Sequence, residues 1–432
     1  MRTAAWYGDR PLDLPFPEDW QVVILTPRTP AALPMWAIRE AIENPIGQES
    51  LRRLAAGKHR PVIIIDDLNR PTPTDKILPF VIACLPDPSK ATIVVATGTH
   101  GPPSPAALHR KIGNIGCRVV VHDPKQGDLN EEVAVSDFLT GIGGIYPNHT
   151  AGFGGGSKLV LGVLGFRQIE SLHHRHRSAG WGAAPGNTFR SELDEVARRI
   201  GLLTVISAHV NADRELVRIV SGDHFTYHAS EADFAYRMFG APEPSDADAV
   251  ISNAYPNDLS LTFARMKGMT PLSRCAPGVS RVAIASCPEG LGFHGLFPFL
   301  NAPRQHHIKT ACRKLARLGP RAIAIKAMDK IQRRRKSGSR NRVWVYRPGD
   351  HDSKLPEQAG DLRVSTSWPD ILDELRAEHA GKTRLRILVY ACAPLQPLTP
   401  LPCTEATSFD LVTDTTTNYS TQMDIRQMEQ VK

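Results

Sequence analysis

The residues of this 432-residue chain that are best suited to chemistry lie in and just after a glycine-rich segment. The segment 151–158, AGFGGGSK, ends in Lys158, and the histidine-rich segment HHRH follows at 173–176. Backbone amides beside glycine can approach an anion closely, so the loop could hold a phosphate. A nucleotide P-loop is excluded, because Ser157 precedes the lysine and Leu159, not a hydroxyl residue, follows it. An ordinary glycine turn with a solvated lysine also fits, and the local spacing leaves both interpretations open.

Further polar residues stand at the ends of two apolar runs. The run 61–67, PVIIIDD, leads to Asp67 and Arg70, and the run 91–100, ATIVVATGTH, ends at His100. Open α/β sheets bind ligands at the carboxyl ends of parallel strands, so both ends are predicted ligand sites. For Asp67 and Arg70, a salt bridge within a turn is the alternative interpretation.

A parallel sheet is needed to position these residues. A third apolar run, CRVVVHD at 117–123, follows a predicted helix, and strands that alternate with helices indicate a parallel sheet with helices on both faces. The stretch PEPS at 242–245 is typical of a linker, and a second α/β unit follows, with a helix predicted at 303–318. The predicted fold class is α/β, with two domains that have mainly parallel sheets. The predicted boundaries are 1–242 for the N-terminal domain with the glycine loop, 243–393 for the C-terminal domain and 394–432 for an irregular tail.

The amino-acid composition limits the kinds of partner expected for this chain. The net charge of +8 arises from the segment 301–350, which has 15 Lys and Arg against 2 Asp. No aromatic residues interleave with its densest part, 333–336, which favours a solvated helix end over a nucleic-acid stripe. Seven scattered cysteines without a CxxC pair argue against a thiolate zinc site and a disulfide framework. No run nears the roughly 18 apolar residues of a membrane span, so the expected location is the cytoplasm, without a membrane partner.

Taken together, the motifs resemble those of the lactate racemase family, whose enzymes are built around a nickel pincer nucleotide. The resemblance covers roughly residues 40 to 300, with the motifs in one order. They are NPIG at 44–47, DDLNRPTP at 66–73, ATGTH at 96–100, AGFGGGSK at 151–158, the IxxxH that ends at His173, SGD at 221–223 and MKGM at 266–269.

The resemblance implies a cofactor, nickel-pyridinium-3,5-bisthiocarboxylic acid mononucleotide, joined to Lys158 through a thioamide and held in the cleft between the two domains. It also implies one histidine as the protein's ligand to nickel. Counting through IxxxH gives His173, the preferred position, whereas a fixed count from Lys158 gives His174, because a proline usual in the family is absent near Gly162. The other residues expected at the cofactor are Asp67, Thr97, Gly98, Gly154, Gly155 and Gly156. The expected partners are a 2-hydroxyacid substrate and the proteins that synthesise the cofactor.

The implied reaction is racemisation or epimerisation of a 2-hydroxyacid by proton-coupled hydride transfer. His100 matches an acid/base histidine of the family, and the ordinary pKa of an imidazole lies near working pH. Arg70 and Lys267 match residues that bind the substrate carboxylate. The family's second acid/base histidine aligns with Asn148, and His149 stands one position along as its expected replacement.

One more pair of substrate contacts differs from the family pattern. Phe263 and Ala264 replace a Tyr-Gln pair, which favours a bulkier or more apolar 2-hydroxyacid than lactate. Two alternatives remain open. One is a stereospecific oxidoreductase that uses the same cofactor through His100 alone, and the other is a protein that binds the cofactor without turnover.

Overall fold

The computed structural model describes residues 1–27, 29–183, 187–297, 342–349 and 352–399. The predicted helix at 303–318, most of the basic segment 301–350 and the tail from residue 400 lie outside the described residues. None of the helices in the described ranges is long and apolar enough to cross a membrane.

The first sheet has six strands in the order β11-β10-β7-β4-β5-β6. All neighbouring strands are parallel except β10 and β11, which are antiparallel. The strands are β4 (Pro61–Asp66), β5 (Thr92–Ala96), β6 (Arg118–Val121), β7 (Phe138–Gly144), β10 (Leu202–Val210) and β11 (Leu216–Gly222). Strand β4 is buried along its whole length, as expected for the apolar run of a central parallel strand.

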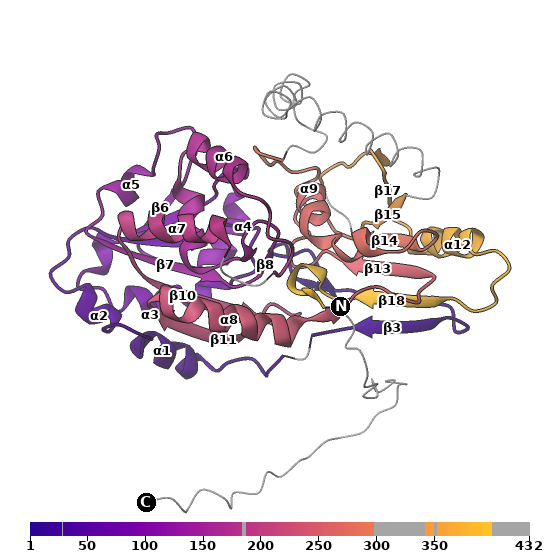
Figure 1. The fold of residues 1–432 in the computed structure, drawn as a ribbon, viewed down its shortest axis with the longest axis horizontal. Helices are drawn as coiled ribbons and strands as arrows, with labels where there is room; N and C mark the ends of the chain where they lie inside the picture. The colour runs from indigo at the N-terminus through magenta and orange to yellow at the C-terminus, as the bar shows by residue number, and fades with distance from the viewer. Residues whose placement is uncertain (28, 184–186, 298–341, 350–351, 400–432) are drawn as a thin grey trace, which may run out of the picture. The chain divides into compact units, whose positions relative to one another are not determined.

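Helices cover both faces of this sheet (Figure 1). Side chains alternate along a strand, so Ile63 and Ile65 of β4 join one apolar cluster, and Val62 and Ile64 join another. The first cluster includes residues of α1 (Met35–Glu43), α2 (Leu51–Leu54), α3 (Leu78–Ile82), α4 (Pro105–Ile112) and α8 (His224–Phe239). The second includes residues of α5 (Glu131–Ala134), the 3₁₀ helix η3 (Gly156–Val163), α6 (Phe166–Arg175) and α7 (Thr188–Arg199).

The second sheet has seven strands in the order β16-β17-β15-β14-β13-β18-β3, and only β16 is antiparallel to its neighbour. They are β3 (Gln21–Leu25), β13 (Ala249–Asn253), β14 (Ser280–Ile284), β15 (Val343–Tyr346), β16 (Gln358–Ala359), β17 (Leu362–Ser365) and β18 (Arg386–Tyr390). The prediction of an α/β fold with two mainly parallel sheets is therefore confirmed. Strand β3 comes from the N-terminal part of the chain, so sheet membership does not follow a division at residue 242.

Short elements complete the described chain. Helix α12 (Trp368–Glu378) packs on the second sheet, and α9 (Leu261–Phe263) runs into the π-helical turn η4 (Ala264–Gly268). The short 3₁₀ turns are η1 (Thr74–Lys76), η2 (Pro88–Lys90), η5 (Pro271–Arg274) and η6 (Ala393–Leu395). Three two-stranded ladders pair β1 (Arg2–Thr3) with β2 (Arg10–Pro11), β8 (Pro147–Asn148) with β9 (Gly152–Phe153), and β12 (Ala241–Pro242) with β19 (Leu398–Thr399). Residues 394–399 are thus folded, which corrects the prediction that the irregular tail begins at 394.

Candidate active site

A cavity of about 520 Å³ opens at the carboxyl ends of the first sheet's central strands. Asp66, Ala96 and Gly144, the last residues of β4, β5 and β7, line it. The predicted site residues that line it are Asp67, Arg70, Thr97, Gly98, His100, Asn148, His149, Gly154, Gly155, Lys158, His173 and Lys267. Gly156 and His174 do not line it. The fold therefore brings together segments that are up to about 200 residues apart in the chain.

His100 and Asp67 form a pair at the ends of β5 and β4. The Nδ1 atom of His100 lies 2.6 Å from Oδ2 of Asp67, and both side chains are largely buried. Burial opposes ionisation of Asp67, but the neighbouring His100 and Arg70 hold its pKa below its usual value. Burial also lowers the pKa of His100, although Asp67 opposes this shift. An Nδ1–H that donates to the carboxylate leaves Nε2 of His100 with a lone pair, which is the arrangement of a general base.

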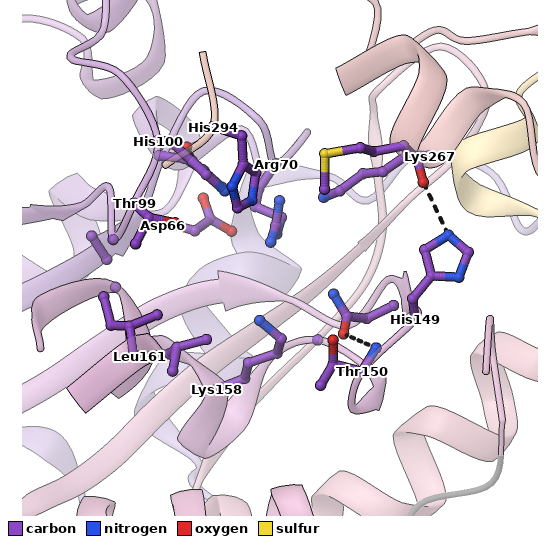
Figure 2. Close-up of a pocket in the computed structure, with 18 of the residues that line it drawn as sticks. Asp66, Arg70, Thr99, His100, His149, Thr150, Lys158, Leu161, Lys267 and His294 are labelled. Atoms are coloured by element: carbon purple, nitrogen blue, oxygen red, sulfur yellow. Dashed lines mark hydrogen bonds and ion pairs between the residues drawn. The ribbon is translucent and has the colours of Figure 1, made fainter. Parts of the chain in front are cut away.

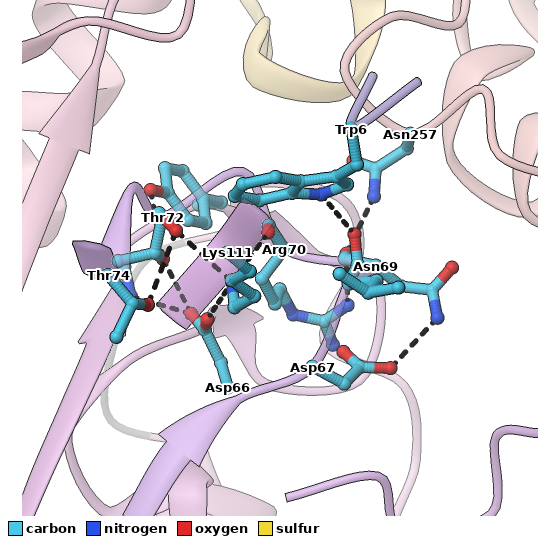
Figure 3. Close-up of polar contacts among 12 residues, drawn as sticks. Trp6, Asp66, Asp67, Asn69, Arg70, Thr72, Thr74, Lys111 and Asn257 are labelled. Atoms are coloured by element: carbon cyan, nitrogen blue, oxygen red, sulfur yellow. Dashed lines mark hydrogen bonds and ion pairs between the residues drawn. The ribbon is translucent and has the colours of Figure 1, made fainter. Parts of the chain in front are cut away.

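A buried lysine fixes the loop after β4 that carries Asp67 (Figure 3). Lys111 of α4 lies 2.7 Å from the Asp66 carboxylate and donates to the carbonyl oxygens of Arg70 and Thr72, each at 3.1 Å. The indole of Trp6 covers the ammonium group and also donates to the Leu68 carbonyl. The sequence did not identify Lys111 or Trp6 as parts of the site, because nothing in either local pattern distinguishes them from surface residues.

Three basic side chains face the cavity. Lys267 projects from the π-helical turn η4 and is buried, and burial together with the Arg70 charge lowers its pKa well below that of an ordinary lysine. Burial, with the charges of Arg70 and Arg190, lowers the pKa of Lys158 to about 7. In Figure 2, Lys158 lies across the cavity from Arg70. The cavity therefore offers basic groups for an anion, and one of them is an amine that is partly neutral near pH 7.

Side chains of α7 and α8 hold the glycine loop by hydrogen bonds to its carbonyl groups. Arg190 of α7 is buried and donates to the Phe153 and Gly155 carbonyls at 2.7 and 3.1 Å. Gly155 has a φ of +73°, and a Cβ there would lie 2.6 Å from the Ile145 side chain, so this turn requires glycine. Gly156 faces side chains of α7 and α8 and does not line the cavity, and its contact with the cofactor stays a prediction.

The two candidate metal ligands, His173 and His174, both lie on α6 but differ in their surroundings. The Nδ1 atom of His173 lies 2.8 Å from the Ile169 carbonyl oxygen, so Nδ1–H donates and Nε2 keeps its lone pair. Burial lowers the pKa of His173 to about 4, which keeps the ring neutral. His174 is exposed and lies outside the cavity. Of these two candidates, His173 lines the cavity and His174 does not; His176 of the same segment also lines it.

Asn148 and His149 occupy one side of the cavity. The Oδ1 atom of Asn148 accepts hydrogen bonds from the amides of Thr150 and Ala151, at 3.0 and 2.9 Å. His149 donates through Nε2 to the Met266 carbonyl at 2.9 Å, which leaves its Nδ1 as an acceptor (Figure 2). Asn148 therefore serves as a turn former, and only His149 carries a group that can exchange a proton near neutral pH.

Comparison with known proteins shows that this chain is similar to lactate racemases. Residues 7–183 match the family model described as the lactate racemase N-terminal domain. The lactate racemase of Lactiplantibacillus plantarum is 29% identical over 290 residues, covering 60% of this chain and 68% of that protein. The lactate racemase of Thermoanaerobacterium thermosaccharolyticum is 25% identical over 288 residues, covering 60% of this chain and 67% of that protein.

Solved structures agree with the fold. The lactate racemase apoprotein of T. thermosaccharolyticum superposes with a TM-score of 0.67 at 21% identity, over 92% of this chain and all of that chain. A protein from Thermotoga maritima superposes with a TM-score of 0.53 at 13% identity, over 86% of this chain and all of that chain.

Proposed function

The chain belongs to the lactate racemase family, and from this premise we propose that it racemises or epimerises a 2-hydroxyacid with a nickel pincer nucleotide tethered to Lys158. The observation that carries the proposal is the cavity shared by the His100–Asp67 pair, the amine of Lys158 and the basic side chains of Arg70 and Lys267. The proposed site lies in the cleft between the first sheet, whose segments carry His100, Asp67 and Lys158, and the turn η4, which carries Lys267.

The donor set fits this cofactor. When bound, the nickel pincer nucleotide would supply a ring that accepts a hydride and returns it. Lys158 offers an amine that is partly neutral near pH 7, the state that an acylating group requires. Among the described residues, no group of three or more His, Cys, Asp or Glu side chains could hold a metal ion; in this proposal the cofactor supplies the other donors. The lone pair of His173 Nε2 is the single protein donor that we assign to nickel.

The chain's own residues bind the substrate and move its proton. Arg70 and Lys267 would pair with the carboxylate, and the hydroxyl proton would pass to Nε2 of His100. Asp67 keeps the proton of His100 on Nδ1 and stabilises the imidazolium that forms. For the opposite enantiomer, His149 would serve as the base through Nδ1, because Asn148 cannot accept a proton.

The cavity wall favours an apolar substituent on the substrate. Phe263 lines it from α9, Phe297 from the segment after β14, and Trp181 from the segment after α6. Their rings offer apolar contact area where the Tyr-Gln pair of the family pattern would offer hydrogen bonds. We therefore expect 2-hydroxyacids with branched or aromatic side chains to be better substrates than lactate.

The test uses protein made in cells that synthesise the cofactor. The intact mass should exceed that of the chain by the cofactor, nickel should be stoichiometric, and chiral chromatography should show conversion of each enantiomer of lactate, 2-hydroxyisovalerate or mandelate. Lys158→Ala should remove both adduct and nickel, whereas Lys125→Ala, at an exposed position, should keep both. A fully nickel-loaded protein of unmodified mass would contradict the tether. Conversion of one enantiomer only, to the 2-oxoacid, would favour the oxidoreductase alternative, and a loaded protein without turnover would favour a binding role.

A further inference from the structure

His294 projects into the same cavity from the segment after β14, and neither the sequence motifs nor the proposed reaction assigns it a role. Its backbone is fixed against the end of β5 by a bridge to His100, and the next residue, Gly295, donates to the Thr99 carbonyl at 2.7 Å. The side chain is only 6% exposed, and Figure 2 shows it beside His100. His294 is therefore a built part of the cavity wall.

Hydrogen bonds define which nitrogen of His294 carries the proton. Its Nδ1 atom accepts from the backbone amides of Leu296 and Phe297, both at 3.2 Å. A nitrogen that accepts from two N–H groups must keep its lone pair, so the neutral ring carries its proton on Nε2. His100 shows the opposite pattern, because its Nδ1 donates to Asp67 and its Nε2 keeps the lone pair. Two neighbouring imidazoles thus present one donor and one acceptor.

The surroundings keep His294 neutral. Burial, reinforced by His100, His173 and Lys267, lowers the pKa of His294 well below that of an ordinary histidine. Protonation would also place an N–H at Nδ1 against the two amides that already point at it. His294 is consequently suited to donate a hydrogen bond and unsuited to act as a base.

We propose that His294 donates through Nε2–H to the hydroxyl oxygen of the substrate enantiomer whose proton His100 removes. This role rests on the proposed function. The rings of His100 and His294 have centroids 4.9 Å apart, close enough for both Nε2 atoms to reach one oxygen. The ring of Phe263 packs against both, at 4.7 Å from His100 and 5.9 Å from His294, and cannot donate to that oxygen itself. His294 would therefore supply a polar contact on the side of the cavity where the family's Tyr-Gln pair is absent.

The proposed donor fits the charge changes of the reaction. As the hydroxyl proton moves to His100, the hydrogen on C2 would leave as a hydride to the ring that the proposed cofactor supplies, and the oxygen would become a carbonyl through a state with extra negative charge. A neutral donor stabilises this charge and keeps its own proton, so the atoms and electrons balance without it. In the reverse direction, the same donor polarises the carbonyl of the planar 2-oxoacid toward hydride addition.

The tautomer is testable in the protein without cofactor. Nitrogen NMR of the apoprotein with ¹⁵N-labelled histidine should show one ring that keeps an Nε2–H and an unprotonated Nδ1 from pH 5 to 9. His294→Gln should remove this signal and no other. Protonation of the ring within this range, or a proton on Nδ1, would overturn the proposal whether or not the protein proves to be a racemase.

The catalytic role is tested with the cofactor-loaded protein and the best converted of lactate, 2-hydroxyisovalerate and mandelate. Removing one oxyanion donor lowers kcat by roughly 10² to 10³, so His294→Leu should show a loss of this size. His294→Gln should recover most of it, because an amide N–H can also donate, and its pH profile should keep the wild-type shape. Equal losses in both variants would mean that His294 only supports the loop. Should the wild-type protein convert none of these acids, the proposed function fails, while the NMR result still decides the donor state.

Discussion

Lys158 should react as a neutral amine near neutral pH in the protein without cofactor. Burial is the largest cause of its lowered pKa of about 7, followed by the charges of Arg70 and Arg190, and Asp67 opposes the shift. At about pH 7.5, an amine with this pKa is roughly three-quarters neutral, whereas an ordinary lysine is about 0.1% neutral. The reactive form is therefore enriched roughly 700-fold, which would prepare Lys158 for acylation by a thiocarboxylated nucleotide.

Competitive labelling of the apoprotein with trace acetic anhydride measures this property. The yield at each lysine is followed by peptide mass spectrometry from pH 5 to 11, and the exposed Lys125 controls for the reagent's own dependence on pH. The labelling midpoint of Lys158 should lie near 7. A midpoint that coincides with that of Lys125 would refute the reasoning, because burial and local charge would then have no net effect on this amine.

Two substitutions separate charge from burial. Arg70→Gln should raise the Lys158 midpoint, because a nearby like charge is removed, and Asp67→Asn should lower it, because a stabilising negative charge is lost. Arg53→Gln is the matched control, since Arg53 is exposed on α2 and is not among the groups that shift Lys158. Equal shifts from Arg70→Gln and Arg53→Gln would show that the effect of charge is not local.

Four further outcomes are expected. In the loaded protein, His173→Ala should lose nickel by elemental analysis while His174→Ala keeps it, and the reverse result would move the ligand by one position. His100→Ala should lower kcat by roughly 10² to 10⁴, and a loss below about tenfold would exclude it as the general base. His149→Ala should suppress conversion of both enantiomers, since racemisation needs both half-reactions, and unchanged conversion would place the second base elsewhere. Because the folded-state pKa of Lys158 is depressed, the folded protein binds fewer protons than the unfolded chain between about pH 7 and 10.5. The free energy of unfolding of the apoprotein should therefore rise by up to about 1.4 kcal/mol per pH unit in this range. Lys158→Met should reduce this slope, as measured by urea unfolding.

The sequence alone predicted the candidate site residues that stand at the ends of apolar runs. The strands β4 and β5 were predicted from PVIIID and ATIVVA, and both are parallel neighbours in the first sheet. Because such strands end at one edge, Asp67 and His100 could each be predicted at a ligand site at a strand end. Their 2.6 Å hydrogen bond could not be predicted in this way, because His100 lies beyond the end of β5, in a turn where its amide donates to the Thr97 carbonyl.

Residues brought in from distant segments could not be predicted in this way. Lys111 stands at a basic helix end of the kind that is usually solvated, and its buried ammonium group pairs with Asp66 at the end of strand β4. His294 follows β14 of the second sheet, and its contact with His100 depends on how that segment folds back. Neither position shows a periodicity that reports such long-range packing. The signal that could have singled out His294 is its setting, because the glycine-rich stretch EGLGFHG at 289–295 has the same character as the loop before Lys158.

The departures from the family pattern gather on the substrate side of the cavity. Lys158 and His173, which we assign to the cofactor, stand in motifs that the chain retains, whereas Asn148 and Phe263 replace residues that would touch the substrate. Asn148 uses its oxygen to close a turn, and Phe263 packs against His100, so both replaced side chains have structural partners here. A chain that had lost catalysis would be expected to lose the buried His100–Asp67 pair as well, because an unused buried ion pair costs desolvation energy. The His100–Asp67 pair is retained, and aromatic rings and His294 line the substrate side of the cavity. This combination favours a changed substrate preference over a loss of turnover.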